Sequence, residues 1–128
     1  MKSLLFTMLC LLFVVSSSCK KDDCVPGNLD TTIVGSWSVK ALGLSLGDVQ
    51  FHANGTLTDP DDVLIGGEVG GEVLSVKTYT VGSNTAFNVR AENASGSSSL
   101  DFDYDVTSYN CDEIVLDVIG IETTMSRK

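Results

Sequence analysis

The segment 100–106 alternates strictly between apolar and acidic side chains. One face would carry Leu100, Phe102, Tyr104 and Val106, and the other Asp101, Asp103 and Asp105. A period of two is typical of an antiparallel strand with one face in the core and one face in water. A slip of one residue would turn three carboxylates into the core, so the register is strongly specified. This segment therefore restricts the chain to a fold rich in antiparallel sheet.

Further short segments show a similar pattern, separated by Gly, Asn and Ser, and no long helical period accompanies them. We expect strands at 37–42, 48–53, 56–57, 73–81, 86–91, 113–119 and 121–125. Together with 100–106 this makes about eight short strands with short connections. Such strands are buried most economically in a sandwich or a barrel, and composition does not choose between the two.

The dipeptide Asn54-Gly55 predicts a hairpin, for which two registers are open. A two-residue turn would pair Phe51 with Thr58. A three-residue loop with Gly55 in the left-handed conformation would instead pair Phe51 with Leu57. We prefer the second register because it places both apolar residues on the buried face.

The start of the chain has the layout of an export signal. A positive end at Lys2 is followed by an apolar run at 4–15, too short for a permanent membrane span, and by three serines before Cys19. This layout resembles a bacterial lipoprotein signal, and Lys21, Asp22 and Asp23 resemble the surface-export signal of Bacteroidota lipoproteins.

The resemblance implies that residues 1–18 are removed and that Cys19 is acylated by fatty acids such as palmitate. Residues 19–32 would form a tether, and the protein would sit in the outer membrane at the cell surface. The alternative is an ordinary secretory signal cut after Ser18, which would leave Cys19 as a free thiol.

Cysteine usage predicts one disulfide. Cys10 leaves with the signal and Cys19 carries the lipid, so Cys24 and Cys111 remain as an even pair in an exported chain. Two unpaired cysteines are the alternative. The net charge is −9, and removal of the signal, whose one charged residue is Lys2, makes it −10. Such a charge argues against nucleic acid and anionic membrane surfaces as partners.

The domain at 33–128 resembles the lipocalin family. Gly35-Ser36-Trp37 matches its Gly-x-Trp signature, and residues 49–56 resemble the second-strand hairpin of lipocalin-like lipoprotein domains of Bacteroidota. Arg127 stands where lipocalins carry a basic residue that packs across this tryptophan. The resemblance implies a small up-and-down antiparallel β-barrel of about eight short strands, closed at one end by Trp37 and Arg127.

The resemblance also implies that the barrel binds a small apolar or amphipathic molecule. The candidate lining residues are Val39, Phe51, Leu57, Tyr79, Phe87, Phe102 and Tyr104. The same residues could fill a solid core, which would make the protein a surface interaction or structural module without a small ligand. The glycine-rich segment 66–73 would be a mobile loop, either an ordinary connection or a lid over the barrel mouth. We expect a monomer.

Catalysis finds little support in the sequence, and we expect no enzyme. His52 is the single histidine, and no phosphate loop, zinc spacing or nucleophile elbow is present. We expect no metal or other cofactor. Calcium at Asp59, Asp61 and Asp62 is the weak exception, because their spacing lacks the full calcium-loop pattern and solvated carboxylates explain them as well.

Overall fold

The computed structural model describes Cys24 and residues 27–128. The expected signal 1–18, Cys19 and residues 21–23 lie outside this part. The described elements are α1 (Leu29–Thr32), β1 (Gly35–Ala41), β2 (Leu44–Phe51), β3 (Leu57–Thr58), β4 (Glu68–Val69), β5 (Glu72–Val73), β6 (Val76–Ser83), β7 (Ala86–Glu92), β8 (Ser99–Tyr109), β9 (Glu113–Val118) and β10 (Ile121–Arg127). Among these residues, no helix has the length and apolar character that a membrane span requires.

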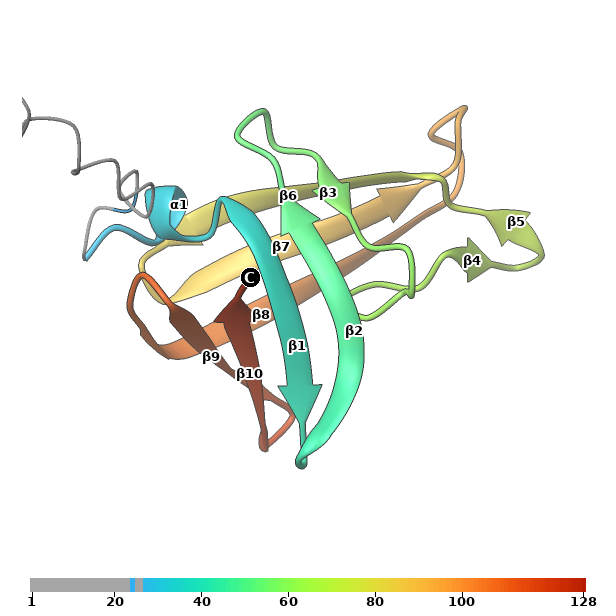
Figure 1. The fold of residues 1–128 in the computed structure, drawn as a ribbon. Coiled ribbons are helices and arrows are strands. Elements are labelled where there is room, and N and C mark those ends of the chain that lie inside the picture. Colours follow the sequence, from blue (N-terminus) through green and yellow to red (C-terminus); the bar gives the residue numbers. More distant parts are fainter. Residues whose placement is uncertain (1–23, 25–26) are drawn as a thin grey trace, which may run out of the picture.

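Eight strands form one antiparallel sheet in the order β3-β2-β1-β10-β9-β8-β7-β6 (Figure 1). The two outer strands approach each other through a single bridge between Thr56 and Thr78, where the Gly55 carbonyl accepts the Tyr79 N–H at 2.9 Å. The sheet is thus a nearly closed up-and-down barrel, which confirms the predicted fold class. The small hairpin of β4 and β5 is inserted between β3 and β6.

The barrel has two different ends. Because neighbouring strands are antiparallel, the connections β1–β2, β3–β6, β7–β8 and β9–β10 lie at one end, which we call the open end. The connections β2–β3, β6–β7 and β8–β9 lie at the other, closed end. Helix α1 covers the closed end beside β6, and its first N–H is accepted by Asn84 of the β6–β7 turn at 3.1 Å (Figure 1).

The predicted register of two segments is confirmed. Phe51 pairs with Leu57 around a three-residue loop, in which Gly55 has a φ of 89°. In β8, Asp101, Asp103 and Asp105 are exposed, while Tyr104 and Val106 are buried. The turn preference of Gly55 thus predicted the first register, and alternation predicted the faces of β8 except at Phe102, which is exposed.

The core contains more than the barrel strands. Leu29, Thr32 and Ile33 of the α1 segment are completely buried, and Leu29 and Ile33 pack with inward residues of the strands. Residues 29–32, which we expected in the tether, are therefore part of the folded domain. The reason is that α1 provides the apolar cover that the closed end needs above Trp37.

Candidate functional site at the open end

The closed end is sealed by the predicted pair of Trp37 and Arg127. Trp37 is fully buried and donates its indole N–H to the Ile33 carbonyl at 2.7 Å. The guanidinium carbon of Arg127 lies 4.2 Å from the centre of the indole ring, a cation–π contact. Its nitrogens also donate to three backbone carbonyls, those of Thr32, Val34 and Cys111. With so many contacts to the backbone, the role of this pair is structural.

The predicted disulfide between Cys24 and Cys111 is confirmed, with the two Cα atoms 5.7 Å apart. It joins the N-terminal segment to the β8–β9 turn, and therefore to the closed end. Because it closes a loop of 87 residues, it stabilises the fold by about 4 kcal/mol in the chain-entropy model.

The interior at mid-barrel is filled by aromatic rings. Phe51 contacts the rings of Tyr79 and Phe87 edge-on, with centroids 4.9 and 5.8 Å apart. Phe87 stacks on Tyr104 at 5.2 Å. Six of the seven predicted lining residues are buried in this core, so their side chains pack against one another.

Phe102 is the exception among the predicted lining residues, because 38% of its surface is exposed. Its partner strand explains this. β9 pairs with β8 only from Asp105 onward, so the first half of β8 extends beyond β9 and leaves the inward face of Phe102 open to solvent at the open end.

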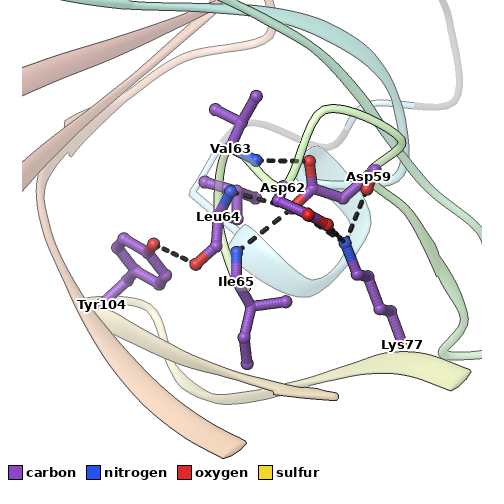
Figure 2. A network of polar contacts seen from close by, with 7 residues as sticks. All are labelled: Asp59, Asp62, Val63, Leu64, Ile65, Lys77 and Tyr104. Atoms are coloured by element: carbon purple, nitrogen blue, oxygen red, sulfur yellow. Dashed lines mark hydrogen bonds and ion pairs between the residues drawn. The ribbon is translucent and has the colours of Figure 1, made fainter. Parts of the chain in front are cut away.

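Residues 59–65 fold back into the barrel mouth, and we call them the plug. Asp59 organises the plug, because its side chain is fully buried and its carboxylate accepts backbone N–H groups from Val63, Leu64 and Ile65 at 2.7, 2.9 and 3.1 Å (Figure 2). This places the side chains of Leu64 and Ile65 in the core. The plug thus occupies the volume through which a ligand would enter the barrel.

Two residues from the barrel wall hold the plug in place (Figure 2). Tyr104 donates its hydroxyl to the Leu64 carbonyl at 2.5 Å, and burial, together with the charge of Asp59, raises its pKa to about 12. Lys77 donates to the Asp59 carbonyl at 2.6 Å and to the carboxylate of Asp62 at 2.5 Å. That bond lowers the pKa of Asp62.

This network was missed by the sequence analysis, which treated Asp59 as solvated acid or a weak calcium ligand. Its oxygens instead accept three backbone N–H groups, and Oδ2 also lies 3.7 Å from the Lys77 ammonium. The carboxylate is thus already paired within the fold. In the described part of the chain, no cluster of three or more His, Cys, Asp or Glu residues could hold a metal ion. The apolar triplet that follows Asp59 within a polar loop was the available signal.

The glycine-rich segment 66–73 forms a two-stranded hairpin, where we expected a loop. β4 and β5 pair through Glu68 with Val73 and through Val69 with Glu72. The carboxylate of Glu72 accepts hydrogen bonds from Asn93 and Ser98 at 2.8 and 2.5 Å. The hairpin is therefore tied to the β7–β8 loop at the open end.

Exposed large hydrophobic side chains gather at the open end. Those of the described residues are Leu42, Leu44, Leu46, Val73, Val76, Phe102, Ile119 and Ile121. Each belongs to a connection, or to the half of a strand next to a connection, on the open side of the barrel. A depression of about 450 Å³ also lies beside the plug, lined by residues that include Leu57, Asp59 and Lys77. The apolar open end is thus the candidate binding region.

No protein family, curated protein or solved structure matches this chain.

Proposed function

We propose that this protein is an exported lipoprotein of the outer-membrane surface, whose lipocalin-like barrel binds small apolar or amphipathic molecules at its open end. The observation that carries the proposal is the confinement of the exposed large hydrophobic residues to that end. Exposed apolar side chains confined to one end of a domain mark that end as a candidate binding surface. The ligand would lie against the mouth and the plug, because aromatic side chains fill the barrel below them.

The disulfide supports an orientation in which the open end faces away from the membrane. Cys19 would be the lipid-bearing residue, and only five positions separate it from Cys24. An extended chain of this length reaches about 17 Å. Since Cys24 is bonded to the closed end, that end would lie next to the membrane and the open end would face away from it.

A binding role also suits the single histidine better than an enzymatic one. His52 lies beside the β2–β3 loop at the closed end, where its ring nitrogen contacts the Thr58 hydroxyl at 2.8 Å. It is thus remote from the apolar end where a ligand would be held. We therefore propose that the protein is not an enzyme.

The packed interior favours a second candidate, a solid-core surface module that binds a macromolecule and no small ligand. The aromatic rings and the buried plug residues pack against one another in a single core, as expected for a barrel whose interior serves only stability. The two candidates differ in one observable, the saturable uptake of a small apolar molecule.

The test uses the chain from residue 19 with Cys19→Ser, produced with its disulfide. Titration with the fluorescent apolar probe N-phenyl-1-naphthylamine should give saturable binding that palmitate displaces. Phe102→Ser should weaken the probe affinity about fivefold, because burial of this ring contributes to the free energy of binding. The matched control is Asp105→Ser, on the outer face of the same strand, which should leave the affinity unchanged. Absence of saturable binding would reject the ligand-binding role and favour the solid-core module.

A further inference from the structure

Two hairpins at the open end have turns of the same kind, which we call tips. Leu42-Gly43 joins β1 to β2, and Ile119-Gly120 joins β9 to β10. The tips are neighbours, because β1 pairs with β10 up to Ala41 and Thr123 (Figure 1, bottom). Each tip has a further aliphatic residue directly after its glycine. We call Leu42, Leu44, Leu46, Ile119 and Ile121 the twin tips.

The backbone of the tips is poorly suited to the residues that they carry. Leu42 and Ile119 have φ values of 52° and 54°, followed by glycines at 74° and 79°. Two consecutive positive φ values define a turn that favours Asn or Asp before Gly, and a β-branched residue such as Ile is a rare occupant. Yet 77% of Leu42 and 90% of Ile119 are exposed, so contacts within the fold do not explain either residue.

A hollow lies next to these protruding side chains. It has a volume of about 430 Å³ and is lined by Lys40, Ala41, Leu42, Gly43, Glu122 and Thr124. Lys40 and Glu122 are exposed charges of opposite sign at this hollow. One end of the molecule thus presents an aliphatic knob, an adjacent hollow, and one charge of each sign.

We propose that the twin tips form the interface of a homodimer, in which Ile119 of each copy enters the hollow of the other. A two-fold axis brings the same surface of both copies together, so it requires a surface that complements itself. The knob beside the hollow meets this requirement. The two charges meet it as well, because the axis can set Lys40 of one copy against Glu122 of the other.

The size of the surface fits a modest dimer. Complete burial of these five exposed residues would remove roughly 600 Å² per copy from water, which places the dimer at the lower limit of about 1,200 Å² for a specific interface. An anionic bilayer is a poorer occupant, because the exposed charges at the hollow, Lys40 and Glu122, are of opposite sign and offer no excess positive charge to anionic headgroups. We therefore expect a dissociation constant in the micromolar range. From the sequence we had expected a monomer, and the twin tips lead us to the dimer.

The experiment is analytical ultracentrifugation of the chain from residue 19 with Cys19→Ser, at concentrations from about 1 µM to 1 mM. The wild-type chain should show a monomer–dimer equilibrium. L42N and I119N should each weaken dimerisation at least tenfold. Both should also fold at least as stably as the wild type, because Asn suits their backbone conformation. Val73→Asn is the matched control, an exposed aliphatic residue outside the tips, and should dimerise normally.

A charge exchange tests the pairing across the axis. K40E and E122K should each weaken the dimer, and the double variant should restore it. A wild-type chain that stays monomeric at 1 mM would overturn the proposal, as would dimers insensitive to L42N and I119N. Binding of monomers to neutral phosphatidylcholine vesicles, abolished by the same two variants, would assign the tips to lipid instead. The dimer and the proposed ligand binding can fail independently, because the probe titration relies on Phe102, which lies outside the twin tips.

Discussion

Asp59→Ala should release the plug and cost about 4 kcal/mol of unfolding free energy. The buried carboxylate accepts three backbone N–H groups at 2.7–3.1 Å. Hydrogen bonds to a charged group contribute about 1.5–3 kcal/mol each. The three bonds share one anchor and are not additive, and water can reach some of the freed N–H groups, so the loss falls below their sum. Since small domains have unfolding free energies of about 5–15 kcal/mol, the variant should remain folded but marginal.

The assay is urea unfolding followed by the fluorescence of Trp37, the single tryptophan. Hydrogen exchange should in addition show faster exchange of the amides of Val63, Leu64 and Ile65 than of the barrel strands. Asp61→Ala is the matched control, because Asp61 is exposed in the same loop, and it should change the stability by less than about 0.5 kcal/mol. A loss below 1 kcal/mol for Asp59→Ala, or unchanged exchange in the plug, would refute the role given to this carboxylate.

Three further predictions concern the other contacts that hold the barrel. Burial raises the pKa of Tyr104 to about 12, against about 10 in an unfolded chain. The contribution of Tyr104 to the unfolding free energy should therefore be intact below pH 10 and fall as the pH rises toward 12. In Tyr104→Phe, the urea midpoint should fall less steeply over this pH range. Joint replacement of Cys24 and Cys111 by serine should lower the unfolding free energy by about 4 kcal/mol, and an equal urea midpoint with and without the disulfide would contradict the loop argument. Arg127→Lys should lower the unfolding free energy by about 2–3 kcal/mol, measured by thermal unfolding, because one ammonium cannot reproduce three carbonyl contacts and the stacking on Trp37. Lys128→Met is the control and should change the stability little, since Lys128 makes only an exposed side-chain ion pair, with Asp48.

The sequence by itself determined the features that depend on short-range pattern. The alternation at 100–106 predicted which residues of β8 face the core, because side chains of a strand point to opposite sides with a period of two. The pairing of Phe51 with Leu57 followed from the turn preference of Gly55 and the need to bury two apolar residues. The disulfide followed from cysteine number, and the Trp37–Arg127 contact from the resemblance to lipocalins.

Only the tertiary structure decided which of these elements a ligand could reach. The plug depends on Tyr104, a residue 40 positions beyond Leu64 in the chain, and no local pattern links the two. Phe102 shares the inward face of Tyr104, yet it is exposed because β9 ends before reaching it. Local alternation specifies the face of a strand, but the lengths of its neighbours decide whether that face is covered. The sequence pattern therefore determined the strands, and the resemblance to lipocalins pointed to a barrel, whereas long-range packing decided that its centre is filled and its open end apolar.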